Sequence, residues 1–247
     1  MIVSNTMKII TYTIAMVLTF IAIHYASTWL ERMGMHSNAI MKFSCKYIIW
    51  SVPAIVATCV IIHPQKNIFK ALGLSANILK GFGAAFISTL PLFVGLGIMG
   101  TLRDGFGVEL LYKKALLPGF SEEFIFRGFL FGMLFRYCKL GFIWSALIPS
   151  VFFGCCHIYQ GTDIVTCLSV FAVTFVGAIY FSWMYVAWRF NLWVPAFLHI
   201  LMNVAWVTLS MEGTDNAAGS LIPNVLRVLS IIIAIGVTIW YRKHISS

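Results

Sequence analysis

Long apolar stretches dominate this sequence and limit the folds that it can adopt. A helix needs about 20 mainly apolar residues to cross a bilayer. Eight stretches approach or reach that length, at 9–30, 45–63, 81–101, 115–137, 141–160, 164–187, 192–210 and 224–240. Because 60% of the residues are hydrophobic and only 10% are charged, too little polar surface remains for a water-soluble globule. The sequence therefore predicts an all-α, polytopic membrane protein with about eight transmembrane helices in a single helical bundle.

The segments between these stretches indicate one membrane-embedded domain over residues 1–247, without an internal repeat. The clearest polar loop is 211–223. In the connector 64–80, Lys66 and Lys70 stand one helical turn apart, which predicts a short helix in the membrane interface. Prolines at 53, 91, 118 and 149 are expected to kink or start helices.

The basic residues predict the orientation of the chain. Nine lysines and arginines fall on the side of the two termini: Lys8, Lys66, Lys70, Lys80, Arg136, Lys139, Arg189, Arg242 and Lys243. Six fall on the other side: Arg32, Lys42, Lys46, Arg103, Lys113 and Lys114. This bias predicts cytoplasmic termini in a multi-pass protein of a bacterial cell membrane. The net charge of +9 is accordingly assigned to contacts with membrane lipid, and no nucleic acid is expected as a partner.

Three charges interrupt the apolar stretch "GFSEEFIFRGFL" at residues 119–130. Charged side chains in a membrane span are costly, and they usually face the interior of the bundle and have a partner. Glu123 and Arg127 have i, i+4 spacing with the glutamate first, which is the favourable order for a helical ion pair. Glu122 lies about 100° further round the helix. The pattern predicts one ion pair and one separate carboxylate.

A purely structural interpretation of the same stretch is a helix start. Ser121 would cap the helix, and the two glutamates would complement the dipole in its first turn. This interpretation leaves Arg127 without a role, because its neighbours in the sequence are apolar or glycine.

Two later stretches carry polar residues of types that suit hydrolysis. "SVFFGCCHIYQG" contains His157, and "FLHILMNVAW" contains His199 and Asn203 on one helix face. Glutamate can activate water as a general base, and histidine can bind a metal or position that water. Histidine and asparagine can also donate hydrogen bonds to an oxyanion.

The three motifs together resemble those of the CPBP family, the CAAX proteases and bacteriocin-processing enzymes also called Abi. "EEFIFR" matches EExxxR, "FGCCH" matches FxxxH, and "HILMN" matches HxxxN. The resemblance covers residues 80–210, as a catalytic region. It implies an intramembrane endopeptidase that acts on a membrane-associated peptide or protein.

The resemblance also implies roles for the motif residues. Glu122 would be the catalytic base, and His157 would act with it on the attacking water. His199 and Asn203 would stabilise the oxyanion. Glu123 and Arg127 would complete the first motif. Two chemistries stay open. Glu122, His157 and His199 could hold zinc as in a metalloprotease, or the glutamate could act without a metal.

Two other interpretations compete with this one. A cysteine peptidase would use Cys155 or Cys156, but thiols in apolar surroundings react poorly. The alternative from another class is a non-catalytic membrane protein, either a transporter or a bacteriocin-immunity factor, because polar residues in spans also line transport paths.

Overall fold

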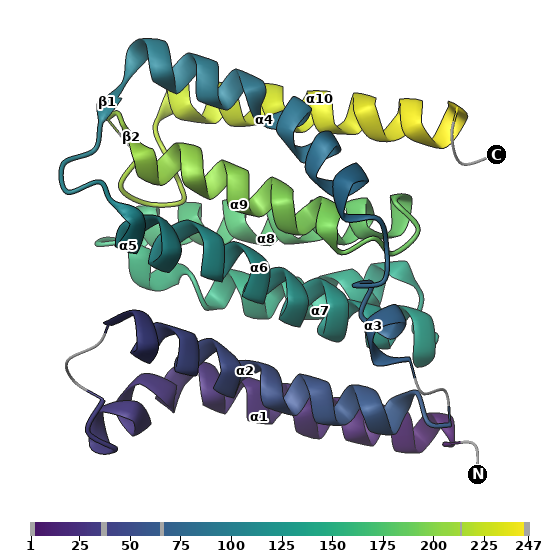
Figure 1. Cartoon of the computed structure of the whole chain (residues 1–247). Coiled ribbons are helices and arrows are strands. Elements are labelled where there is room, and N and C mark those ends of the chain that lie inside the picture. Colours follow the sequence, from purple (N-terminus) through teal and green to yellow (C-terminus); the bar gives the residue numbers. More distant parts are fainter. Residues whose placement is uncertain (1–2, 36–38, 65–66, 213, 245–247) are drawn as a thin grey trace.

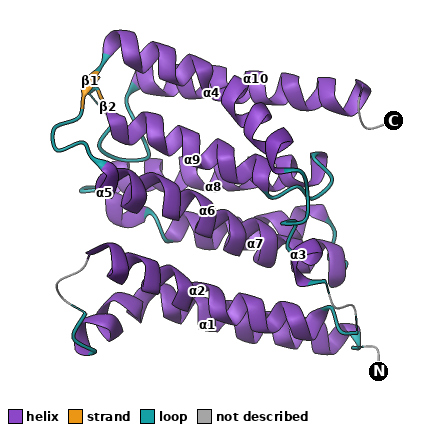
Figure 2. Ribbon diagram, in the orientation of Figure 1, coloured by secondary structure: helices purple, strands orange, loops and turns teal. Residues whose placement is uncertain are grey.

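The protein is a bundle of helices, as the hydropathy predicts. The computed structural model describes residues 3–35, 39–64, 67–212 and 214–244. Helices make up nearly all of the ordered structure, and two short strands pair at one end (Figures 1 and 2). The main helices are α1 (Asn5–Arg32), α2 (Ala39–Ile61), α4 (Ile78–Met99), α7 (Phe142–Cys155), α8 (Ile164–Ala187), α9 (Trp193–Thr208) and α10 (Leu221–His244).

The first motif lies in a helical run of mixed type between α4 and α7. It consists of α5 (Val108–Leu111), the π-helical segment η1 (Tyr112–Leu116), α6 (Leu117–Glu123) and the π-helical segments η2 (Phe124–Phe131) and η3 (Met133–Tyr137). Pro118 explains η1, because a proline ring clashes with the carbonyl four residues earlier and a wider turn relieves that clash. Glu122 lies deep in this run and not in its first turn, so the helix-start interpretation is wrong.

Each predicted span has a helical counterpart, but the helices differ in their fitness to cross a membrane. Among the described residues, six helices are long and apolar enough by length and composition: α1, α2, α4, the stretch Phe142–Gln160, α8 and α10. The stretch Phe142–Gln160 joins α7 to the short 3-10 helix η4 (Ile158–Gln160). The exceptions are the mixed run 108–137 and the 16-residue α9. These two helices carry the EExxxR and HxxxN motifs.

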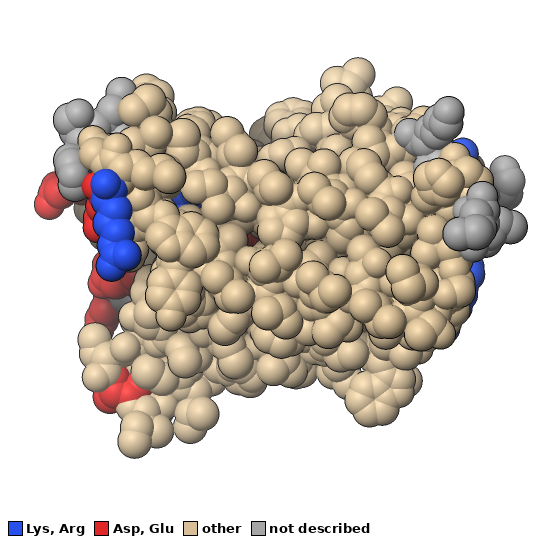
Figure 3. All heavy atoms as spheres, turned by 90° about the horizontal axis from the view of Figure 1, so that it is seen from below, with Lys and Arg blue, Asp and Glu red and all other residues tan. Residues whose placement is uncertain are grey.

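Both termini lie at the same end of the bundle (Figure 1). Figure 3 shows one face on which an almost uncharged band separates this end from the opposite one. Only basic residues colour the terminal end in that view, whereas the far end carries acidic side chains together with basic ones. An apolar belt between two charged ends is the surface that a bilayer requires.

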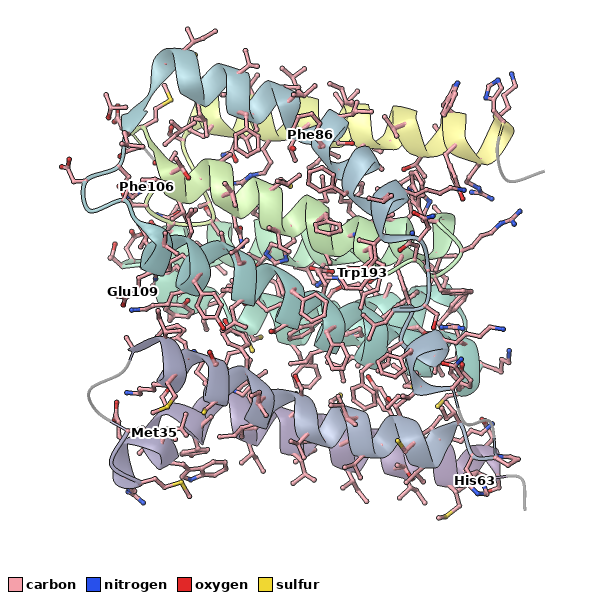
Figure 4. The ribbon with its side chains drawn as sticks, in the orientation of Figure 1. Met35, His63, Phe86, Phe106, Glu109 and Trp193 are labelled. Atoms are coloured by element: carbon pink, nitrogen blue, oxygen red, sulfur yellow. The ribbon has the colours of Figure 1, made fainter. Side chains whose placement is uncertain are left out.

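The helices stack in layers across the bundle. The α1–α2 pair packs on the 108–137 run, which contacts α7 and α9. In turn α9 packs on α4, and α4 packs on α10 (Figure 1). Side chains fill the space between these ribbons (Figure 4). The mixed run and α9 therefore occupy the middle of the protein, with apolar helices on both sides.

The connectors differ in part from expectation. The helix predicted in the connector 64–80 is only the four-residue α3 (Ile68–Ala71), and Leu72 after it is buried in the core. Lys66 lies outside the described residues. The loop after α9 begins with strand β2 (Leu209–Ser210), which pairs antiparallel with β1 (Thr101–Leu102). Arg103 fastens this loop through Thr214 and Asp215 at 3.1 and 3.3 Å.

The close approach of α6 to α9 brings the first and third motifs together. A Cβ atom added at Gly119 would meet the side chain of Ile200 at 2.7 Å and its backbone at 2.9 Å. One residue later, Phe120 stacks on Trp193 with ring centroids 5.7 Å apart. Only glycine permits this helix contact, which sets the distance between the glutamates and His199.

We predict that Gly119→Ala destabilises the protein, because the new methyl group would strike backbone that cannot move freely. Overpacking of this kind costs about 1–3 kcal/mol, which corresponds to a fall of about 2–4 °C in Tm for each kcal/mol in a chain of this size. Thermal unfolding in detergent would measure it. Gly83→Ala in α4 is the matched control, since a Cβ there meets nothing within 4 Å. An equal Tm for both variants would contradict the close contact.

Candidate active site

The two adjacent glutamates point to different partners, as their positions on the helix predict. The Glu123 side chain is 0% exposed and faces Arg127 and His199. The Glu122 side chain is 14% exposed and faces His157. The polar cluster therefore has two parts, one sealed and one accessible.

The sealed part contains the ion pair predicted from the i, i+4 spacing. Arg127 Nη1 lies 3.0 Å from Glu123 Oε1, and the arginine side chain is 1% exposed. The guanidinium also faces the rings of Phe153 and Phe181, with its central carbon 4.8 and 5.2 Å from their centroids. The contact with Glu123 is an ion pair by distance and does not meet the geometry of a hydrogen bond: all three guanidinium nitrogens, and Glu123 Oε2, are buried without a hydrogen-bond partner in the described structure. A charge buried this deeply depends on the ion pair and the two aromatic faces.

His199 joins the sealed part through Glu123. Its Nδ1 lies 2.8 Å from Glu123 Oε1, the oxygen that also meets Arg127. A carboxylate paired with arginine can only accept, so His199 Nδ1–H is the donor. Sequence reasoning grouped His199 with Glu122, whereas the structure brings it to Glu123. The donated proton fixes the ring and leaves His199 Nε2 available for other contacts.

The accessible part combines Glu122 with His157, which lies just beyond the end of α7. His157 Nδ1 is 2.7 Å from the Phe153 carbonyl oxygen, and a carbonyl can only accept, so Nδ1 carries a proton. His157 Nε2 faces Glu122 Oε2 at 3.8 Å, which is beyond hydrogen-bond distance. The side chains are 14% and 17% exposed. This pair presents two polar atoms, side by side, to anything that enters the site.

Asn203 lies one helical turn after His199 on α9 and is half-buried. The i, i+4 spacing puts both side chains on one face of the helix. The start of α9 is held by Asn191, which accepts a hydrogen bond from the Trp193 backbone and donates one to the Asn77 carbonyl, both at 3.0 Å. Asn191 thus ties the start of α9 to the connector before α4, and this contact helps to orient the helix face that carries His199 and Asn203.

The two cysteines in the second motif lie beside this site but are not paired with a histidine in the described structure. Cys155 is exposed and Cys156 is half-buried. The ring of His157 is committed to the Phe153 carbonyl and to Glu122. The geometry therefore favours the carboxylate over a thiol as the group that His157 assists.

The three candidate zinc ligands do not gather around one point. Glu122 pairs with His157, while His199 is bound to Glu123. Across the described ranges, no group of three or more His, Cys, Asp or Glu side chains is arranged to hold a metal ion. A tetrahedral zinc site needs three protein ligands about 2 Å from the metal, so this arrangement does not fit zinc.

Sequence reasoning missed three neighbours of Glu122. Lys46 and Tyr47 on α2, and Tyr159 on η4, lie close enough to interact with its charge. From the sequence, Lys46 counts only among the basic residues that predict the orientation of the chain. A signal existed in the sequence, because Lys46 stands in an apolar stretch among Phe43, Tyr47 and Trp50.

Comparisons with known proteins agree with the motifs. Residues 106–205 match the family described as "Type II CAAX prenyl endopeptidase Rce1-like". The "Putative membrane peptidase YdiL" of Bacillus subtilis (strain 168) is 35% identical over 107 residues, which are 43% of this chain and 39% of that protein. The match thus covers less than half of the relative's length. The family resemblance predicted from the motifs is confirmed, and the matched region contains every predicted site residue.

We predict that Glu123 and Arg127 are strongly coupled in stability. Breaking a buried pair by removing one partner leaves an uncompensated charge and costs about 3–5 kcal/mol. Glu123→Gln and Arg127→Gln should each lower Tm, and the double variant should recover part of the loss. The measurement is a double-mutant cycle on thermal unfolding in detergent. Simple additivity would mean that the pair contributes no coupling.

The chain offers a matched control for this cycle. Glu109 and Lys113 have the same spacing and order and lie 3.1 Å apart, but their side chains are 59% and 24% exposed. Exposed helical pairs are worth about 0.3–0.5 kcal/mol. Glu109→Gln and Lys113→Gln should therefore be nearly neutral, and a similar coupling at both pairs would argue against a special role for burial.

Proposed function

We propose that this chain, whose residues 106–205 resemble the Rce1-like CAAX peptidases, is an intramembrane endopeptidase that uses Glu122 to activate water. The observation that carries the proposal is the accessible Glu122–His157 pair beside a sealed pair of charges. The substrate is a peptide or protein associated with the membrane.

The donor pattern of His157 supports a specific placement of the water. Because its Nδ1–H is donated to the Phe153 carbonyl, the neutral ring offers Nε2 as an acceptor. Glu122 as a carboxylate is also an acceptor. A water between them would give one hydrogen to each and direct its oxygen lone pair outward, toward a peptide carbonyl.

The chemical steps then follow from general acid–base catalysis. Glu122 takes a proton as the water oxygen bonds to the carbonyl carbon. The tetrahedral intermediate collapses as the C–N bond breaks, and the protonated Glu122 returns its proton to the leaving nitrogen. No metal is needed for the proton balance.

His199 and Asn203 would stabilise the oxyanion. The Asn203 amide is a donor in any protonation state. His199 already donates Nδ1–H to Glu123, so it can donate from Nε2 only as an imidazolium. Glu123 Oε1, 2.8 Å from Nδ1, would lie beside the charge of that imidazolium. Glu123 would thus be a positioning residue that supports His199.

We predict that Glu122→Gln and His157→Ala lose peptide cleavage, while Cys155→Ala and Cys156→Ala keep it. Loss of a general base reduces the rate by about 10²–10⁴-fold. His199→Ala should also be inactive, because it removes an oxyanion donor. The assay is cleavage of a peptide in proteoliposomes, with thermal unfolding as a check of folding. A folded but inactive cysteine variant would support the thiol mechanism.

The substrate for this assay has to be found first. Comparative proteomics of membranes carrying the wild type or Glu122→Gln would reveal precursors that accumulate in the variant. Solute flux without cleavage in the same proteoliposomes would instead support the transporter alternative.

We predict that activity survives the removal of metal ions, because the three candidate ligands are divided between two contacts. The test is cleavage after extensive chelation, with the zinc content of the sample measured in parallel. About one zinc per chain, with an activity that chelation removes and zinc restores, would overturn the metal-free mechanism.

A further inference from the structure

A half-buried lysine on α2 lies beside the site and has no part in the proposed chemistry. Lys46 shares a helix face with Tyr47, Trp50, Ala54 and Ala57, which are buried in the bundle. The helix packs on α1 and on the 108–137 run. Lys46 therefore points toward the interior of the protein, where an ionisable residue is a candidate functional group.

Aromatic rings surround the ammonium group of Lys46. Its Nζ lies 5.0, 5.3 and 4.7 Å from the ring centroids of Phe43, Tyr47 and Trp50. Ring faces stabilise a cation but do not accept its hydrogen bonds as an oxygen does. An ammonium carries three N–H donors, so this lysine keeps the capacity to bind an anion.

The neighbouring lysines are engaged differently. Lys42 is paired with Glu31, and Lys113 with Glu109. In the part of the chain that the structure describes, no carboxylate lies within ion-pair distance of Lys46. Glu122 is near enough to attract it electrostatically, but the two do not form an ion pair. Lys46 is thus a cation within electrostatic range of Glu122, surrounded by rings and without a carboxylate partner among the described residues.

We propose that Lys46 is a specificity-determining residue that binds a carboxylate of the peptide substrate close to the scissile bond. This proposal rests on the proposed peptidase function. A substrate carboxylate would be repelled by Glu122, and the adjacent ammonium offsets that repulsion. The carboxylate belongs either to the C-terminus of the peptide or to an aspartate or glutamate side chain.

A different role is charge compensation, in which Lys46 merely stabilises Glu122. The two roles predict different kinetics. Compensation would change the cleavage of every substrate by the same factor, whereas recognition changes only substrates that carry the carboxylate. Substrate charge, and not overall activity, is therefore the readout.

The experiment uses the full-length protein in nanodiscs and a peptide that the wild type cleaves but Glu122→Gln does not. Four dansylated forms of this peptide are compared: the C-terminal free acid and the C-terminal amide, and each with glutamate or glutamine near the cleavage point. The wild type should prefer the forms with a carboxylate by about tenfold in kcat/KM, mainly through KM, which is the worth of one charge-assisted hydrogen bond. A preference for the free acid alone identifies the C-terminus, and a preference for glutamate alone identifies the side chain.

Three variants test whether Lys46 causes the preference for peptides that carry a carboxylate. Lys46→Met should abolish it and Lys46→Arg should retain most of it. Lys114→Met is the matched control, since Lys114 is an exposed lysine of η1 that also acts on Lys46 electrostatically. Loss of the preference in Lys114→Met as well would point to general attraction and overturn the specific site. The proposal is equally wrong if Lys46→Met slows all four peptides by the same factor.

Binding of the same peptides, measured by dansyl fluorescence, separates this proposal from the peptidase function. If no peptide is cleaved, the peptidase function fails. Carboxylate-dependent binding that Lys46→Met removes would still support the lysine site. Equal binding of acid and amide forms would overturn it.

Discussion

The buried Glu123–Arg127 pair is the interaction on which the rest of the site depends. Both side chains are sealed from solvent, and their contact is 3.0 Å long. The rings of Phe153 and Phe181 cover the guanidinium, and His199 binds the same carboxylate oxygen. One pair of charges therefore connects the 108–137 run with α7, α8 and α9. Removing either charge would leave the other buried and uncompensated in surroundings that solvate it poorly.

Placing Glu123 in the interior also determines what Glu122 can reach. Adjacent helical residues differ by about 100° in direction, so Glu122 is turned toward α2 and the end of α7. There it meets His157 and remains partly exposed. The sequence "EE" thus supplies one sealed and one accessible carboxylate. A single carboxylate could not be both, because the ion pair with Arg127 is buried and the proposed general base needs access to water and substrate.

Local spacing explains which parts could be predicted from the sequence. The apolar stretches predicted the bundle, and the i, i+4 order predicted the pair of Glu123 with Arg127, since both residues lie on one helix. The partner of His199 could not be predicted, because it depends on how closely α6 approaches α9 at Gly119. The strand pair also escaped prediction, because it joins residues that are distant in the chain. Lys46 was missed because a lysine near a predicted span end is ordinarily a topology signal.

The helices that carry the EExxxR and HxxxN motifs are those least suited to cross a membrane alone. The 108–137 run is interrupted by π-helical turns and charges, and α9 has only 16 residues. Each polar group in them raises the cost of exposure to lipid. Six longer apolar helices, several of them lying on either side of this pair, supply the lipid-facing surface. That division lets the central helices bend, widen and hold charge, because their contacts are with protein and not with hydrocarbon. The same shielding makes an inward lysine such as Lys46 tolerable, since aromatic rings take the place of lipid around its charge.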